Sequence, residues 1–119
     1  MSSRPFEAHN RIESGAAVID LHGDIDAASD LGLNAAFEEA SQTRLPVILL
    51  NFADVDYINS TGIALIVSLL AKARKAGQKL LTCSLNDHYT QIFQITRLAD
   101  FMGVYPDEAS ALQGASARA

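Results

Sequence analysis

The sequence of 119 residues contains one cysteine, Cys83, and few basic residues. A single cysteine cannot form an internal disulfide, so a disulfide-stapled fold is excluded and a reducing compartment is expected. Lysine and arginine together number 9 against 14 acidic residues, which gives a formal net charge of −5. Because a small acidic domain is poorly suited to a nucleic-acid backbone, we expect no nucleic-acid partner.

Long hydrophobic runs are also missing. The longest apolar stretch, residues 62–71, is interrupted by Ser68 and spans about ten residues, whereas a membrane helix needs about 20. The polar first residues, 1–11, lack the apolar segment of a signal peptide. We therefore expect a cytoplasmic domain with no membrane partner.

The composition that remains is typical of a folded protein. Hydrophobic residues make up 49% of the chain and charged residues 19%, which argues against wholesale disorder. A chain of this length forms one domain and buries about two thirds of the surface that it exposes when unfolded. We expect this domain to span residues 6–113, with short flexible tails at residues 1–5 and 114–119.

The hydrophobic pattern predicts an α/β fold. Two closely spaced runs, residues 6–12 and 16–21, predict an N-terminal antiparallel hairpin. The continuous apolar run at residues 47–50 predicts a strand that is buried on both faces. The other expected elements are helices within residues 26–40, 61–76, 86–98 and 106–113, and strands at residues 80–83 and 101–105. The order β-β-α-β-α-β-α-β-α indicates a mixed, mostly parallel sheet with about four helices.

The second predicted helix has unusually wide apolar coverage. Its core-facing residues are predicted to be Ile63, Ile66, Val67 and Leu70. Leu65 and Leu69 would then project to the side of this stripe, next to Lys72. Two interpretations stay open: the helix is simply more apolar than average, or the side residues form a patch that a partner protein covers.

Ser60 lies where the buried strand is joined to this helix, in the segment NFADVDYINSTG at residues 51–62. In open α/β sheets, ligands and active groups gather beyond the carboxyl ends of the strands. The simplest interpretation is that the Ser60 hydroxyl caps the helix by accepting a backbone N–H. A phosphate on Ser60 would also be tolerated there, because a helix N-terminus favours an anion. The two roles do not exclude each other.

A second polar loop, Gly-Asp-Ile-Asp at residues 23–26, follows the predicted hairpin. It is either a polar turn in which Asp26 caps the first helix, or a functional loop at the same sheet edge as Ser60. In the second case Asp24 and Asp26 could position a kinase-bound metal, orient the serine or repel a phosphate.

No constellation of catalytic or metal-binding residues is recognisable. The three histidines are scattered without metal-ligand spacing, and no phosphate-binding glycine motif or GxSxG motif is present. His22 is the only base near Ser60, and nothing in the sequence orients it. We expect a protein that is not an enzyme and that uses no metal and no cofactor.

The same motifs resemble those of a STAS domain, and in particular of the bacterial anti-sigma factor antagonists. GDID at 23–26, VILLNF at 47–52, DVDYINSTG at 54–62 and KAGQKL at 75–80 follow one another in the order of that family. The resemblance implies a STAS-type fold and a function in partner switching. The unphosphorylated antagonist binds an anti-sigma factor, which is also an ATP-dependent serine kinase, and so frees the sigma factor. Phosphorylation ends this binding, and a PP2C-type phosphatase restores it.

Carried onto this chain, the resemblance makes Ser60 the phosphorylated residue. The acidic loop implies kinase contacts, and the helix that begins near Thr61 is similar to the family's docking helix. The partner-binding residues implied in this way are Asp24, Asp26, Asn59, Thr61, Gly62, Leu65, Leu69 and Lys72. The family usually has aspartate before the serine, whereas this chain has Asn59, which keeps the size but removes a charge.

An alternative within the same family stays open at this point. A STAS domain can also be a scaffold or regulatory subunit of a stressosome-like, signalling or lipid-transport complex, and fold alone does not separate these functions. The sequence also leaves open whether the domain is a monomer or a homodimer.

Overall fold

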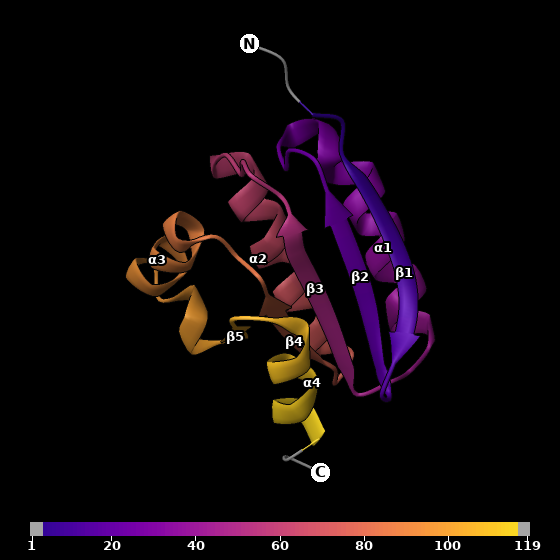
Figure 1. The fold of residues 1–119 in the computed structure, drawn as a ribbon. Coiled ribbons are helices and arrows are strands. Elements are labelled where there is room, and N and C mark those ends of the chain that lie inside the picture. Colours follow the sequence, from indigo (N-terminus) through magenta and orange to yellow (C-terminus); the bar gives the residue numbers. More distant parts are fainter. Residues whose placement is uncertain (1–3, 117–119) are drawn as a thin grey trace.

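The computed structural model describes residues 4–116 as one mixed α/β domain. Its five-stranded sheet has the order β1-β2-β3-β4-β5 (Figure 1). The strands are β1 (Glu7–Glu13), β2 (Ala16–His22), β3 (Val47–Asp54), β4 (Lys79–Cys83) and β5 (Gly103–Tyr105). The helices are α1 (Asp30–Gln42), α2 (Ser60–Lys75), α3 (Asp87–Ile95) and α4 (Glu108–Ser116), with short 3-10 turns η1 (Ala27–Ser29) and η2 (Leu98–Asp100). The predicted element order and sheet type are confirmed.

The N-terminal hairpin is antiparallel, as predicted, and the remaining strand pairs are parallel. Ser14 and Gly15 form its turn with φ values of 49° and 80°, the left-handed conformation that a two-residue hairpin turn requires. The carboxyl ends of β2 and β3 lie at one edge of the sheet, which is the upper edge in Figure 1. The loops that follow these two strands therefore meet.

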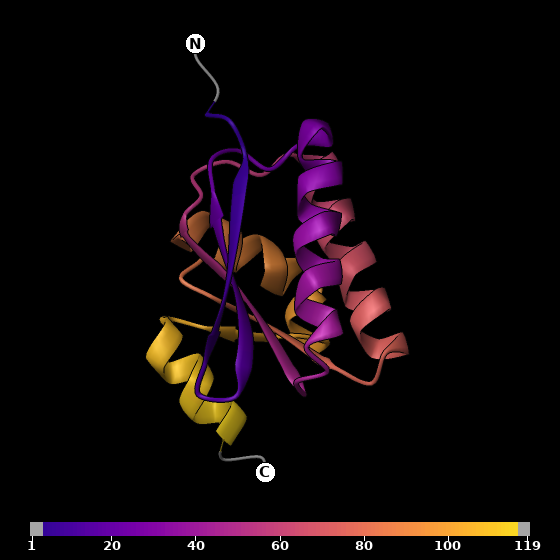
Figure 2. The same ribbon diagram turned by 90° about the vertical axis from the view of Figure 1, so that its right-hand side faces the viewer.

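Helices cover both faces of the sheet. Figure 2 shows α1 and α2 side by side over one face and α4 over the other. Alternate residues of the parallel strands supply two separate cores. The larger core includes Ile19, Leu21, Ile48, Leu50 and Phe52 beneath α1 and α2. The smaller core includes Val18, Leu49, Leu81 and Cys83 of the strands together with Ala111 of α4, which packs over them. Burial of β3 on both faces, predicted from its continuous apolar run, is confirmed.

The predicted face of α2 is rotated from the observed one. Leu69, expected beside the core stripe, is fully buried, whereas Val67, expected within it, is 44% exposed. The helix packs on β4 and also rests against α1 and η1. This second set of neighbours extends burial to the Leu69 side of the helix. The prediction that Leu69 projects from the helix as a partner contact is therefore wrong for the folded chain.

Parts of both expected tails belong to the described structure. Residues 114–116 continue α4, and Arg4 forms backbone hydrogen bonds with the loop after β2. Residues 1–3 and 117–119 of the expected tails lie outside the described residues. The last strand begins at Gly103 and not at Phe101, which is 59% exposed. No helix within residues 4–116 is long and apolar enough to cross a membrane.

Candidate functional site

The N-terminus of α2 is capped by Asn59 and not by Ser60. Asn59 has an extended backbone, with φ −89° and ψ −179°, and its Oδ1 accepts the N–H of Gly62 at 2.9 Å. Ser60 is the first helical residue and is exposed. The prediction that Ser60 caps the helix is wrong by one position, because asparagine and serine are about equally good caps and occur here in succession. The exposed Ser60 hydroxyl thus has no part in the cap.

The two polar loops predicted to share a sheet edge are joined by backbone hydrogen bonds. Ile25 and Ile58 form an isolated parallel bridge. Ile25 N donates to Tyr57 O at 2.9 Å, and Asn59 N donates to Ile25 O at 3.1 Å. The loop at residues 23–26 therefore lies directly beside the segment that leads into Ser60.

Gly62 allows α2 to approach this loop closely. A Cβ atom at Gly62 would lie 2.3 Å from Ile25 O and 2.8 Å from Ile58 Cγ2, closer than atoms can pack. Gly62 is itself buried, so its place in the expected partner surface is not supported by exposure. The absence of a side chain at Gly62 allows the helix to lie this close to the acidic loop.

Asp26 caps η1, as one of the two interpretations of this loop predicted. Its carboxylate accepts the N–H of Ala28 at 3.0 Å, and Asp26 N donates in turn to Ser29 Oγ at 3.0 Å. The Ser29 hydroxyl, which is fully buried, donates to Asp24 O at 3.1 Å. These reciprocal bonds fix the loop that presents Asp24 and Asp26, both of which remain partly exposed.

A cation that the sequence analysis missed lies at this acidic edge. The Arg4 guanidinium pairs with Asp54 at 2.9 Å and with Asp56 at 3.3 Å. His22 Nδ1 lies 2.8 Å from Asp54 Oδ2. The hydrogen bonds from His22 and then from Arg4 hold the pKa of Asp54 below its ordinary value. Arg4 is far from these carboxylates in the sequence, and no local pattern connects them. The ion pairs could therefore not be predicted from the sequence.

The remaining expected contact residues lie along the flank of α2 that faces α1. Thr61 is exposed and Leu65 is half-buried. The Lys72 ammonium donates to the side chain of Asn34 on α1. Lys72 lies about 18 Å further along the helix than Ser60, at 1.5 Å per residue. The structure thus groups Asp24, Asp26, Asn59, Ser60 and Thr61 at one edge and places Lys72 apart from them.

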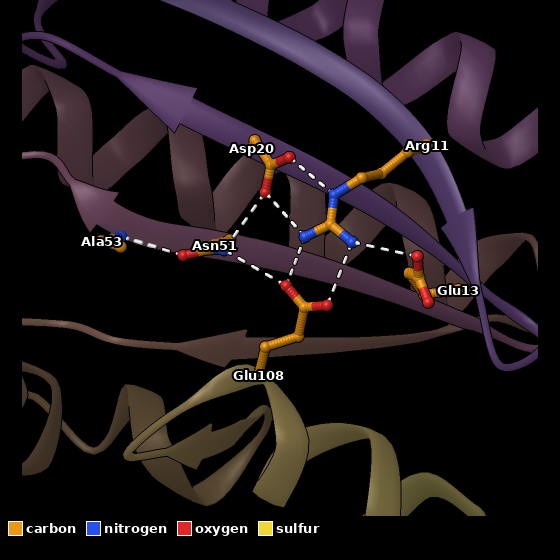
Figure 3. Close-up of polar contacts among 6 residues, drawn as sticks. All are labelled: Arg11, Glu13, Asp20, Asn51, Ala53 and Glu108. Carbon is orange, nitrogen blue, oxygen red and sulfur yellow. Dashed lines mark hydrogen bonds and ion pairs between the residues drawn. The ribbon is translucent and has the colours of Figure 1, made fainter.

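A second polar network, also missed, lies on the sheet face covered by α4 (Figure 3). Arg11 pairs with Asp20 at 2.7 Å and with Glu108 of α4, and Asn51 Nδ2 donates to Asp20 Oδ1 at 3.1 Å. Arg11 holds the pKa of Asp20 below its ordinary value. The network attaches α4 to the hairpin and, through Asn51, to β3. Its signal was the diagonal placement of opposite charges on β1 and β2.

The described residues 4–116 form no candidate metal cluster. Within residues 4–116, no three His, Cys, Asp or Glu side chains are grouped so as to hold a metal ion.

Cys83 is fully buried, and burial raises the pKa of its thiol to about 11. The Cys83 thiol is therefore protonated and unreactive at neutral pH.

Comparison with known proteins matches nearly the whole domain. The model of the STAS domain family matches residues 7–111. The anti-sigma-B factor antagonist of Listeria monocytogenes is 27% identical over 86 residues, which cover 72% of this chain and 75% of that protein.

Solved structures share the fold. The anti-sigma factor antagonist from Mycobacterium paratuberculosis superposes with a TM-score of 0.77 at 17% identity, covering 92% of this chain and 93% of that one. The Bacillus cell fate determinant SpoIIAA in its phosphorylated form superposes with a TM-score of 0.68 at 19% identity, covering 93% and 99%. At these identities the likeness concerns the fold alone.

Proposed function

Because the chain belongs to the STAS domain family, we propose that it is an anti-sigma factor antagonist whose binding is switched by phosphorylation of Ser60. In its unphosphorylated form it binds an anti-sigma factor and thereby releases the sigma factor. In this proposal the chain is a regulatory binding protein of the cytoplasm, and its partners supply the catalysis. The likeness to the Listeria anti-sigma-B factor antagonist supports this choice among STAS functions.

The observation that carries the proposal is the separation of Ser60 from the helix cap. Asn59 accepts the N–H of Gly62, so a phosphate on the exposed Ser60 hydroxyl breaks no capping bond. The first turn of α2 also offers free N–H groups and the positive end of the helix dipole to the new charge. Modification is therefore expected to change binding much more than stability.

Electrostatics supports a switch at this edge. Phosphorylation adds about −1.5 to −2 charges at pH 7. These charges would join Asp24 and Asp26, both partly exposed on the neighbouring loop. A partner whose surface matches the unphosphorylated edge would then meet a bulky dianion at the centre of its contact, which costs binding free energy.

The proposed docking surface follows from exposure. It consists of Asp24, Asp26, Asn59, Ser60, Thr61 and Leu65, with Lys72 at its far end. The kinase activity of the anti-sigma factor transfers the γ-phosphoryl group of ATP to Ser60 Oγ. The Oγ–P bond forms as the bond between the γ-phosphorus and the bridging oxygen breaks, ADP leaves, and the hydroxyl proton is released to solvent. A PP2C-type phosphatase hydrolyses the phosphoserine and restores the binding form.

The test is phosphorylation by a kinase-type anti-sigma factor from the same organism. Incubation with the kinase and ATP is expected to add one phosphate, which mass spectrometry maps to Ser60. Ser60→Ala is expected to abolish the modification, whereas Thr61→Ala, the matched control, retains it. Modification that maps to Thr61, or that persists in Ser60→Ala, contradicts the proposal.

A further inference from the structure

Arg4 connects the two loops that form the Ser60 edge. We propose that Arg4 is a positioning residue for this edge: it joins the loop after β2 to the segment between β3 and α2 and so holds the surface that the kinase recognises. The kinase part of this inference rests on the proposed function, whereas the structural part concerns the free protein alone.

The backbone of Arg4 attaches to the acidic loop at two points. Arg4 N donates to Asp24 Oδ2 at 3.1 Å, and Asp24 N donates to Arg4 O at 3.1 Å. The side chain then reaches the other segment, where it pairs with Asp54 at 2.9 Å and with Asp56 at 3.3 Å. One residue thus contacts three carboxylates: Asp24 in the loop after β2, Asp54 at the end of β3 and Asp56 in the segment that follows it.

The shape of the acidic loop is adapted to this contact. Gly23 has φ +86°, and a Cβ atom there would lie 2.1 Å from Pro5 O and 3.0 Å from Arg4 O. Any side chain at this position would displace residues 4–5. Glycine at residue 23 therefore serves both the left-handed backbone and the close approach of the Arg4 segment.

The effect of Arg4 is expected to be local. The Arg4, Asp54 and Asp56 side chains are 43%, 52% and 81% exposed, and exposed ion pairs contribute little to global stability. Loops of this kind open locally without global unfolding. A contact between them therefore changes the fraction of molecules in which both loops have the arrangement described above. The position of the acidic loop affects Ser60 through the neighbouring Asn59, because the N–H of Asn59 donates to Ile25 O in that loop.

Hydrogen exchange in the free protein tests the structural part. In Arg4→Ala, the amides of Asp24, Ile25 and Asn59 are expected to exchange at least about threefold faster, while the Tm changes by less than about 2 °C. Lys75→Ala is the control: it removes the same charge from the exposed last residue of α2 and should leave these amides unchanged. Unchanged exchange in Arg4→Ala, or equal acceleration in the control, overturns the proposal.

Arg4→Lys separates geometry from charge. Lysine keeps the charge but lacks the planar fork that reaches two carboxylates at once. We expect exchange rates between those of the wild type and Arg4→Ala. Rates identical to those of the wild type would contradict the role assigned to the guanidinium fork.

Phosphorylation kinetics with the kinase of the previous section tests the functional part. Arg4→Ala is expected to raise the KM of the chain as a substrate about threefold or more while retaining kcat, because fewer molecules present the correct edge. Lys75→Ala should keep both constants. Faster exchange with an unchanged KM contradicts the positioning role. Failure of the wild type to be phosphorylated on Ser60 contradicts the proposed function instead, and the exchange result stands by itself.

Discussion

Asn59 Oδ1 accepts the N–H of Gly62 at 2.9 Å, so the residue that caps α2 is not the candidate phosphoacceptor beside it. A serine that served as both cap and switch would lose a structural hydrogen bond on each modification. Division of these roles between Asn59 and Ser60 allows the stability of the helix and the charge of its first residue to change independently.

Stability should therefore depend on Asn59 and not on Ser60. Asn59→Ala removes the cap and is expected to lower the free energy of unfolding by about 1 kcal/mol, whereas Ser60→Ala should change it by less than about 0.5 kcal/mol. Asn59→Asp retains the acceptor and should retain the stability. Urea unfolding of the three variants measures these differences. A loss in Ser60→Ala as large as that in Asn59→Ala would show that the hydroxyl has a structural role.

Gly62→Ala should disturb the acidic edge. The added methyl group would meet Ile25 O and Ile58 Cγ2, and forcing such an overlap costs about 1–3 kcal/mol. We expect lower stability together with chemical-shift changes in residues 23–26 in NMR spectra. Ser68→Ala, an exposed position of the same helix, is the control and should be neutral or slightly stabilising. A Gly62→Ala protein as stable as the wild type, with an unchanged loop, would contradict the close approach.

The Arg11 network predicts a pH dependence of stability. The pKa of Asp20 is lowered in the folded chain by Arg11, so its contribution is present at neutral pH and is lost as the pH falls below about 4, the ordinary range of aspartate. Asp20→Asn should be less stable than the wild type at pH 7 by about 1 kcal/mol, and this difference should shrink below pH ~4. Unfolding curves at several pH values measure it.

Glu38→Gln provides the control for this pH series. Glu38 is exposed on α1 and makes no ion pair within residues 4–116. Its difference from the wild type should stay small at every pH. An Asp20→Asn difference that persists unchanged in acid would mean that packing, and not the ion pair with Arg11, accounts for the effect.

Cys83 should be unreactive in the folded protein. Its side chain is fully buried, and burial raises the pKa of the thiol to about 11, so the thiolate is scarce at pH 8. Ellman's reagent is expected to release one equivalent per chain in denaturant and to react in native buffer only at the rate of opening. Rapid reaction of the native protein would place the thiol at the surface.

The parts of the fold governed by local patterns were predictable. The apolar run of β3 predicted burial on both faces, and the spacing of β1 and β2 predicted their hairpin. The meeting of the acidic loop with the Ser60 segment followed from the parallel order of the strands. These features depend on periodicity and topology, which a single sequence carries.

The features that the sequence analysis missed depend on tertiary neighbours. The core face of α2 includes Leu69 and excludes Val67 because α1 packs against one flank of the helix. Asn59 and Ser60 are both suitable caps and adjacent in the sequence, so a shift of one residue in the start of α2 decides which of them is the cap. Arg4 and its carboxylate partners are far apart in the sequence, and no periodicity connects them.

The affinity for the anti-sigma factor before and after phosphorylation tests the central claim most directly. Isothermal titration of that protein with the unphosphorylated chain, the chain phosphorylated on Ser60 and Ser60→Ala gives three dissociation constants. We predict similar values for the unphosphorylated chain and Ser60→Ala, and binding at least about 100-fold weaker for the phosphorylated chain. Equal affinity of the phosphorylated and unphosphorylated chains would contradict the switch.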